Sequence, residues 1–408
     1  MAEIKNTKVF NNNLIPSDWE ISELGLVGKV SSGGTPDTTN EIFWNGNINW
    51  CTPTDITKLN GSKYIGETVV KISDAGLKNS SATLLPKGSV IVCTRATIGK
   101  TAISVEEIST NQGFKNIIPN DKKVDVEFLY YSIINSEHQL LRLGNGSTFL
   151  EVSKSDFEKF RILLPPLPEQ KAIAQVLSTA DAAIHATEKL IIQKELRKKW
   201  LMQQLLTGKK RLKGFGGKWK EVPLSEMFSE RNETRYFDLP LLSIGQNGVY
   251  PQDESVKKDT SNEDKSKYKR ICPGDIGYNT MRMWQGRSAL SGLEGIVSPA
   301  YTVVTPKKNA DSLFFSYLFK MPKMTNLFWR NSQGLVDDTL NCKFKDFSIV
   351  KVMLPQNKEE QTAIAQVLQT ADKEISLLKA KAEKLREQKK GLMQVLLTGK
   401  VRLKINNT

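Results

Sequence analysis

Two short loops carry the residue types that nucleotide and base chemistry requires. Residues 94–101 read T-R-A-T-I-G-K-T, which fits the phosphate-binding pattern G-x-x-x-x-G-K-[ST] at every fixed position except the first. That position is Thr94, whereas consecutive backbone N–H groups can wrap a phosphate only if glycine stands there. The sequence therefore argues against nucleotide hydrolysis at this loop.

The second loop, Ser298-Pro299-Ala300-Tyr301, is similar to the S-P-P-Y loop with which amino-methyltransferases hold a flipped base. Its third residue is alanine, and no glycine-rich S-adenosylmethionine loop after a strand accompanies it. A metal-dependent nuclease would need clustered carboxylates, and the chain fits that pattern only by chance. We therefore predict no catalytic and no metal-binding residue, and a stand-alone DNA adenine methyltransferase remains as the enzymatic alternative.

Arginine stands four residues before glycine at four places, and these places correspond between two long segments of the chain. The pairs are Arg95 with Gly99, Arg282 with Gly286, Arg142 with Gly146, and Arg330 with Gly334. A cation, Lys100 or Arg287, directly follows the first two glycines. Arginines in such loops either read guanine through two hydrogen bonds or only hold the loop through carboxylates.

The segments that must position these loops are separated by a repeated string. Residues 169–212 and 360–403 align without a gap at a displacement of 191 residues, and about 24 of the 44 positions are identical. Both copies have apolar residues at alternating steps of four and three, which predicts a helix with one stripe facing a partner helix. Both end at Thr-Gly, and glycine can close a helix in the left-handed conformation. Each helix would be a rod of roughly 57 Å at about 1.5 Å per residue.

We call the apolar stripe of the two helices the seam. Because the second copy repeats the register of the first, we expect the two stripes to pack against each other as an antiparallel coiled coil. The residues predicted for this pairing are Ile173, Leu177, Ile184, Ile191, Leu201 and Leu205 in the first helix, and Ile364, Leu368, Ile375, Leu385, Leu392 and Leu396 in the second.

The two remaining segments differ in sequence but share landmarks in the same order. Each opens on a tryptophan, Trp19 or Trp219, and each closes with Asp-Phe and a run ending in Leu-Pro. Short β-branched runs cut by Gly, Pro, Asn and Asp, together with helical stretches, predict mixed α/β domains. We expect an α+β protein with pseudo-twofold symmetry: a domain at 1–165, a long helix at 166–212, a second domain at 213–355, and a second helix with a tail at 356–408.

Composition limits the classes of partner. The net charge is +14, with 58 Lys and Arg against 44 Asp and Glu, which favours a polyanionic partner. No apolar run approaches the length of a membrane span and the first residues lack a signal peptide's apolar stretch, so we expect a cytoplasmic protein without a membrane partner. The four cysteines lie far apart without C-x-x-C spacing, and we expect them to be reduced and buried.

The order of variable domain, long helix, variable domain, long helix resembles the specificity subunit of Type I restriction-modification enzymes. The resemblance covers almost the whole chain and is carried by the E-Q-x-A-I-A-Q-V-L helix starts, the L-L-T-G-K-x-R-L helix ends and the Leu-Pro before each helix. It implies two target recognition domains, each reading one half of an asymmetric bipartite site in double-stranded DNA, with the helices setting the gap.

The resemblance also implies partners. Two methyltransferase subunits would dock on the helices and restriction subunits would join them, so that S-adenosylmethionine, ATP and Mg belong to these partners and this chain holds no cofactor. We infer in addition that exposed parts of the helices, with Trp200 in one and Gly391 at the matching place in the other, form unequal docking faces. The alternative is that Trp200 only fills a gap where the two helices cross. A coiled-coil adaptor without DNA contact is the remaining alternative.

Given DNA as the partner, the loop residues that can meet base edges become the candidates for recognition. These candidates are Thr94, Arg95, Lys100, Arg142 and Asn145 in the first domain, and Asn279, Arg282, Trp284, Arg287 and Arg330 in the second.

Overall fold

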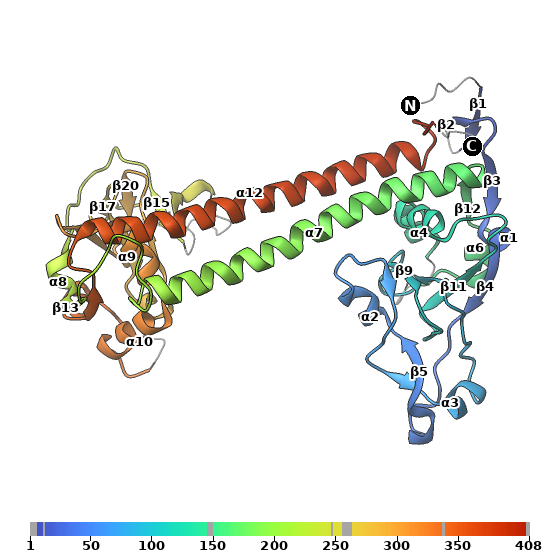
Figure 1. The fold of residues 1–408 in the computed structure, drawn as a ribbon, viewed down its shortest axis with the longest axis horizontal. Helices are drawn as coiled ribbons and strands as arrows, with labels where there is room; N and C mark the ends of the chain where they lie inside the picture. The colour runs from blue at the N-terminus through green and yellow to red at the C-terminus, as the bar shows by residue number, and fades with distance from the viewer. Residues whose placement is uncertain are drawn as a thin grey trace. The chain divides into compact units, whose positions relative to one another are not determined.

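The computed structural model describes residues 6–10, 13–144, 150–245, 248–254, 263–336 and 339–404 (Figure 1). The chain divides into two compact units. Unit 1 comprises Met1–Thr187 with Lys381–Thr408, and unit 2 comprises Glu188–Ala380. Each unit therefore combines one sheet-containing domain with part of each of the two long helices.

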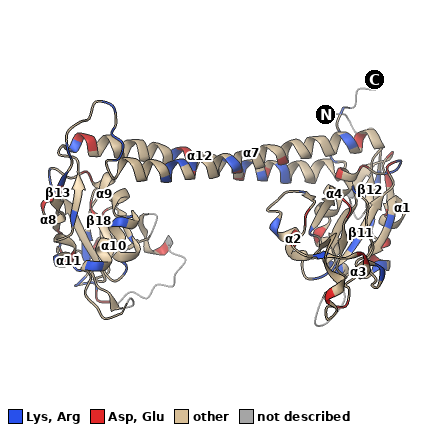
Figure 2. Cartoon of the chain, turned by 60° about the horizontal axis from the view of Figure 1, so that its bottom comes forward, with Lys and Arg blue, Asp and Glu red and all other residues tan. Residues whose placement is uncertain are grey.

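The two long helices are confirmed. Helix α7 is Leu167–Leu205 and helix α12 is Lys358–Leu396, each of 39 residues. Gly208 and Gly399 follow them with φ of +69° and +72°, so both glycines adopt the left-handed conformation expected after a helix end. Figure 2 shows Lys and Arg alternating with Asp and Glu along both helices, as expected for faces exposed to water.

Within each unit, α7 and α12 run antiparallel. In unit 1, Ile173 and Leu177 of α7 share a core with Met393 and Leu396 of α12. In unit 2, Leu205 of α7 shares a core with α12 in the same way, and its partners there are Ile364 and Leu368. The predicted seam residues are buried or partly buried at all twelve positions.

The domain of unit 1 is built on a five-stranded sheet in the order β4-β11-β8-β9-β6. Neighbouring strands of this sheet pair antiparallel, except that β6 and β9 pair parallel. Helix α4 packs on β8 and β9 and brings Phe128 and Tyr131 into the core. The bounds are β4 Gly28–Ser32, β6 Tyr64–Ile65, β8 Val90–Cys93, β9 Thr101–Ser104, β11 Phe114–Pro119 and α4 Val126–Asn135.

Smaller elements surround this sheet. Strand β5 lies between β10 and β7, β3 pairs with β12, and β1 pairs with β2. Their bounds are β1 Thr7–Phe10, β2 Asn13–Pro16, β3 Glu20–Glu23, β5 Trp44–Cys51, β7 Lys71–Ile72, β10 Ser109–Thr110 and β12 Arg161–Leu164. The short helices are α1 Leu24–Val27, η1 Glu41–Phe43, α2 Pro53–Lys58, α3 Asp74–Lys78, α5 Glu137–Leu143 and α6 Lys154–Glu158.

The domain of unit 2 is built on a four-stranded antiparallel sheet in the order β14-β21-β18-β19. Helix α9 packs on β19, and phenylalanines of α9, α10 and α11 fill the core. The bounds are β14 Phe228–Glu230, β18 Ile276–Asn279, β19 Ser288–Leu290, β21 Tyr301–Pro306, α9 Ser312–Leu318, α10 Pro322–Asn331 and α11 Phe344–Ser348.

Three strand pairs and three short helices complete this domain. The pairs are β13 Lys220–Pro223 with β22 Lys351–Leu354, β15 Leu242–Ile244 with β16 Val249–Pro251, and β17 Lys269–Ile271 with β20 Gly295–Val297. The helices are α8 Leu224–Met227, η2 Gln252–Glu254 and η3 Met283–Gln285.

The two domains are topologically equivalent at their centres. The run β4-β11-β8-β9 of unit 1 corresponds to β14-β21-β18-β19 of unit 2, and the pair β3–β12 corresponds to β13–β22. The turns before β8 and β18 also match, because Gly88 and Gly274 have φ of +85° and +92°. The mixed α/β class and the internal repeat are thus confirmed.

Two further expectations concern cysteines and membranes. All four cysteines are free; Cys51, Cys93 and Cys342 are buried, but the expectation of burial is wrong for Cys272, which is partly exposed at a turn. Among the described residues, no helix has both the length and the apolar character needed to cross a bilayer.

Candidate nucleic-acid interface

In the second domain, the candidate loop joins β18 to β19 and is held in shape by its own residues. The Asn279 side-chain oxygen accepts a hydrogen bond from the Met281 backbone N–H at 3.0 Å, and the Trp284 indole donates to the Met281 carbonyl at 3.1 Å. Gly286 turns the loop back with a φ of +72°. Two of the candidates therefore shape the loop, while Arg287 is exposed and Arg282 is partly exposed.

Three other segments meet this loop. Thr280 donates through both its backbone N–H and its hydroxyl to the Ala300 carbonyl, at 3.1 and 2.8 Å. The Cys342 N–H in turn donates to the Thr280 carbonyl at 2.9 Å, and η3 packs against α10. The structure thus gathers the arginine loop, the Ser298–Tyr301 turn, the end of α10 and the Gln333–Asn341 bridge at one edge of the domain.

This edge is cationic. The sequence has no Asp or Glu within residues 279–291, 298–301, 322–336 and 339–345. Asp337 and Asp338, between the last two ranges, lie outside the described residues. Figure 2 shows Lys and Arg on α10 and α11. The cations are Arg282, Arg287, Lys323, Arg330, Lys343 and Lys345, of which all except Arg282 are classed as exposed. An edge of this kind attracts phosphate, and its arginines can in addition read base edges.

The three lysines of this edge were missed by the sequence reasoning. Lys323, Lys343 and Lys345 have no counterpart at a repeated landmark, so the comparison of the two copies does not select them. The signal that could have found them is the long acid-free run around Arg330.

In the first domain, the corresponding loop joins the equivalent strands β8 and β9 but has a different chemistry. Thr94 is buried, and its hydroxyl donates to the Gly113 carbonyl at 3.3 Å. Arg95 is partly exposed and its backbone forms a bridge with Glu151, while Lys100 is exposed. Thr94 therefore supports the loop from inside, and its role in DNA contact stays a prediction.

Acidic residues pack beside this first loop. A Cβ built on Gly99 would come within 2.6 Å of the Glu137 side chain at the start of α5, and Glu151 forms an ion pair with buried Lys115 at 3.1 Å. Arg142 is exposed in the last turn of α5, and Asn145 lies outside the described residues. The first candidate edge is therefore less uniformly cationic than the second.

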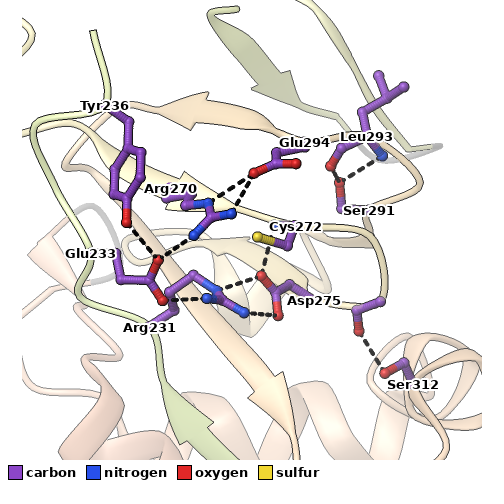
Figure 3. Close-up of polar contacts among 11 residues, drawn as sticks. Arg231, Glu233, Tyr236, Arg270, Cys272, Asp275, Ser291, Leu293, Glu294 and Ser312 are labelled. Atoms are coloured by element: carbon purple, nitrogen blue, oxygen red, sulfur yellow. Dashed lines mark hydrogen bonds and ion pairs between the residues drawn. The ribbon is translucent and has the colours of Figure 1, made fainter. Parts of the chain in front are cut away.

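A separate cluster in the second domain pairs two arginines with three carboxylates (Figure 3). Arg231 donates to both carboxylate oxygens of Asp275, at 2.7 and 3.3 Å, and also contacts Glu233. Arg270 donates to Glu233 at 2.8 Å and to Glu294 at 2.9 Å. The hydrogen bond from Arg231 to Asp275 is the main cause that raises the pKa of Arg231.

This cluster joins β14, β17 and the turn before β18, and its geometry indicates a structural network. Asp275 is also held by the Cys272 N–H at 2.8 Å. In the first domain, Ser89 occupies the matching turn position and donates to the Pro86 carbonyl at 2.7 Å. The network is therefore a feature of the second domain alone, and its arginines are engaged by carboxylates.

The chain is similar to known proteins along most of its length. The sequence model of the family described as Type I restriction modification DNA specificity domain matches residues 16–196 and 216–387. The MjaIX specificity subunit of a Type I restriction enzyme from Methanocaldococcus jannaschii is 36% identical over 208 residues, which cover 49% of this chain and 47% of that protein. This chain thus spans about half the length of that relative.

Two longer matches extend the comparison. The MjaVIII specificity subunit from the same organism is 25% identical over 435 residues, covering 98% of this chain and 97% of that protein. The solved structure of the Type I restriction-modification S subunit from M. genitalium has the same fold, with a TM-score of 0.57 at 14% identity, covering 96% of this chain and 98% of that one. Because the two family matches together cover most of its residues, the chain belongs to the Type I restriction-modification DNA specificity family and contains two of its specificity domains.

Proposed function

We propose that this protein recognises double-stranded DNA and directs partner subunits to an asymmetric bipartite target. The observation that carries the proposal is the combination of two specificity domains that differ in sequence with two long helices that are nearly copies of each other. Domains that differ at their recognition loops read different half-sites. The two helices, which are alike, hold these two domains through equivalent contacts.

The first domain contacts DNA through the loop after strand β8, and the second domain through the loop after the equivalent strand β18. In the second domain, Arg282, Arg287 and Arg330 meet bases, while the neighbouring lysines bind phosphates and position the duplex. In the first domain, the contacts with bases and phosphates are made by Arg95, Lys100 and Arg142. The second domain's edge supports this assignment, because its described cations are mostly exposed and no Asp or Glu lies within residues 279–291, 298–301, 322–336 and 339–345.

Catalysis belongs to partner subunits. Two methyltransferase subunits carry S-adenosylmethionine, and restriction subunits use ATP and Mg to cleave unmodified DNA, while this chain acts in the cytoplasm as the reader. The names of the relatives MjaIX and MjaVIII, both specificity subunits of Type I restriction enzymes, support this division of labour.

An exposed apolar stripe on α7 is the docking face for one methyltransferase subunit. Ile192, Leu196 and Trp200 follow one another at intervals of four residues, and their exposed fractions are 58%, 63% and 45%. Large apolar residues lined up on a helix face and exposed to this extent mark a protein interface. Trp200 is thus too exposed to serve only as filler between the helices, and Lys210 lies 4.7 Å from its ring centroid.

The matching face of α12 is chemically different. The positions 191 residues later are Glu383, Glu387 and Gly391. Two identical partners would therefore meet an apolar face on one helix and a charged face on the other. This inequality supports docking faces of different affinity.

The test is to sequence methylated adenines in DNA from cells that carry this chain with its partners. The expected result is a split, asymmetric motif with an unread gap, and a short continuous palindrome would contradict the proposal. Equilibrium dialysis of the purified chain separates the enzymatic alternative, since retained S-adenosylmethionine would favour a methyltransferase. Modification that stays unchanged after Arg282, Arg287 and Arg330 are all replaced by alanine would favour an adaptor without DNA contact.

A further inference from the structure

Three residues from three separate elements meet in unit 1. The Tyr131 hydroxyl of α4 donates to Asp181 of α7 at 2.6 Å, and the Lys389 ammonium of α12 lies 2.5 Å from the other oxygen of the same carboxylate. Lys389 also lies 5.3 Å from the centroid of the Tyr131 ring. Each of the three groups therefore contacts the other two. We call this set the first latch.

Unit 2 contains the same arrangement. The Tyr317 hydroxyl of α9 donates to Asp372 of α12 at 2.6 Å, and Lys198 of α7 lies 2.5 Å from the other carboxylate oxygen. Lys198 again lies 5.3 Å from the tyrosine ring centroid. We call this set the second latch. Its aspartate and lysine stand 191 residues from those of the first latch, so they occupy identical positions in the repeat.

The tyrosines are the informative members, because they belong to the domains rather than to the repeated helices. Tyr131 and Tyr317 lie on helices that pack on the equivalent strands β9 and β19, in domains that otherwise differ in sequence. Burial is the main cause that raises the pKa of both hydroxyls, and the hydrogen bond to aspartate raises it further. Both tyrosines therefore remain proton donors at neutral pH.

Each latch requires one register of the helix pair. The lysine comes from the opposite long helix, so it meets its aspartate only when the two helices align at that turn. A slip by one heptad would move the lysine by about 10.5 Å and break the contact. The apolar seam alone tolerates such slips because its residues repeat at a heptad interval, whereas a polar contact in a seam selects one register.

The helix ends are held by other contacts. In each unit an arginine beyond a helix end binds a buried glutamate at the start of the opposite helix: Arg402 with Glu169, and Arg211 with Glu360. The first clamp also reaches its recognition domain, because Arg402 donates to Asp18 and the Trp19 indole donates to Glu169. Loss of a latch contact therefore leaves the helix ends joined, while it removes a contact that ties α4 or α9 to both long helices at once.

We propose that the two latches, Tyr131–Asp181–Lys389 and Tyr317–Asp372–Lys198, are positioning residues that fix each recognition domain on the helix pair and so restrict the protein to one spacer length between half-sites. The inference rests on the proposed recognition of bipartite DNA. It adds a specific source for the spacing, namely side-chain contacts rather than helix length alone.

The surroundings of the two latches differ. Beside the first, Lys63 pairs with Glu127 at 2.8 Å and donates to Ser178 at 2.7 Å. Beside the second lies Lys320, whose pKa is lowered by burial and then by Lys198, while Asp372 counteracts the shift.

The test uses the full chain with its partner subunits in cells, and the readout is the set of gap lengths among methylated motifs. The wild-type complex should show one gap length. Asp181→Lys should add gaps longer or shorter by one base pair or more, with unchanged half-sites. The charge swap Asp181→Lys with Lys389→Asp should return the single gap.

The matched control is Glu195→Lys, because Glu195 forms an exposed ion pair with Lys379 between the same two helices at 2.7 Å. It introduces the same cation but should leave the gap unchanged. Reduced modification at one unchanged gap in Asp181→Lys would overturn the proposal, since a purely structural role lowers the amount without altering the spacing.

If Asp181→Lys abolishes all modification, Tyr131→Phe and Tyr317→Phe decide the question, because each removes only a hydroxyl. Additional gaps in these variants support the latches, and a single gap in both overturns them. The failure of the proposed function has a different signature, since the wild-type complex would then show no bipartite motif at all.

Discussion

Arg402 binds both carboxylate oxygens of Glu169, with its Nε and Nη2 atoms at 3.0 and 2.5 Å. Glu169 is almost fully buried, and Arg402 also donates to Asp18 at 2.9 and 2.8 Å. The same two-point contact recurs between Arg211 and Glu360, at the matching positions of the repeat. The start of each long helix is thus tied to the segment that follows the end of the other.

Replacing this arginine should destabilise unit 1. Arg402→Ala would leave the Glu169 carboxylate buried without its cation, and breaking such a pair costs about 3 kcal/mol. Urea unfolding followed by circular dichroism measures the loss. Arg386→Ala is the control, because Arg386 pairs with Glu383 at an exposed position of α12 and its loss should change the free energy of unfolding by well under about 1 kcal/mol.

Arginines and lysines of the second domain's cationic edge should respond differently to replacement. Arg287→Ala should cost about 1–3 kcal/mol of DNA binding and relax the preference at one base pair. Lys343→Ala should weaken binding to all sequences and lower the salt dependence by about one counterion. Binding of the assembled complex to duplexes carrying the methylated motif, titrated with salt, separates these outcomes. Equal losses on every sequence for Arg287→Ala would contradict its role in base reading.

Trp200 should matter for assembly rather than for folding. Trp200→Ala should weaken the binding of one methyltransferase subunit by about 2 kcal/mol or more, because exposed tryptophans at interfaces are frequent hot spots. Native mass spectrometry of the complex would then show a shift from two bound subunits to one. Leu377→Ala provides the control on α12, since Leu377 is 72% exposed and lies outside the proposed stripe. An unchanged stoichiometry in Trp200→Ala would remove the stripe as the docking face.

The stability of unit 1 should fall in acid through Glu127. Burial disfavours the ionised carboxylate, but hydrogen bonds from Lys63, Ser178 and Tyr64 outweigh it, so the pKa of Glu127 in the folded protein lies below its ordinary value of 4.5. A lowered folded pKa stabilises the fold above the ordinary value, and this contribution is lost as the pH falls through the lowered one.

Glu127→Gln should therefore be less stable than the wild type by about 1 kcal/mol near neutral pH, and the difference should shrink at pH of about 3. Urea unfolding at a series of pH values measures both. Glu158→Gln, which removes an exposed carboxylate paired with Lys154, is the control and should change the free energy of unfolding by well under about 1 kcal/mol. A Glu127→Gln difference that stays constant with pH would refute the assignment.

Sequence patterns predicted the long helices well, because the heptad pattern is local and occurs in both copies of the repeat. Ile173 and Ile364 could be recognised from the repeat alone as counterparts in the two helices. Each is buried where the two helices meet in its own unit. The order of the strands could not be predicted, because strands such as β4 and β11 are distant in sequence and their pairing depends on contacts that no local period encodes.

The sequence predicted candidate loops, but not the contacts that their residues make, and the role of these loops in DNA binding stays a prediction. The repeated arginine-to-glycine spacing led to loops that follow the equivalent strands β8 and β18. The pattern could not reveal that the Thr94 hydroxyl is used inside the domain, or that Asn279 shapes its own loop. Likewise Tyr131 carries no sequence signal for its contact with Asp181, which lies 50 residues away.

Trp19 and Trp219, which open the two domains, differ in their hydrogen bonding. The Trp19 indole donates to Glu169 at 3.1 Å, whereas the buried indole nitrogen of Trp219 has no hydrogen-bond partner among the described residues. Among the described residues, the side-chain hydrogen bonds to Glu360 come from Arg211. Replacing Trp19 by phenylalanine would therefore remove a donor from the buried Glu169 carboxylate, whereas the same replacement at Trp219 would remove no hydrogen bond among the described residues.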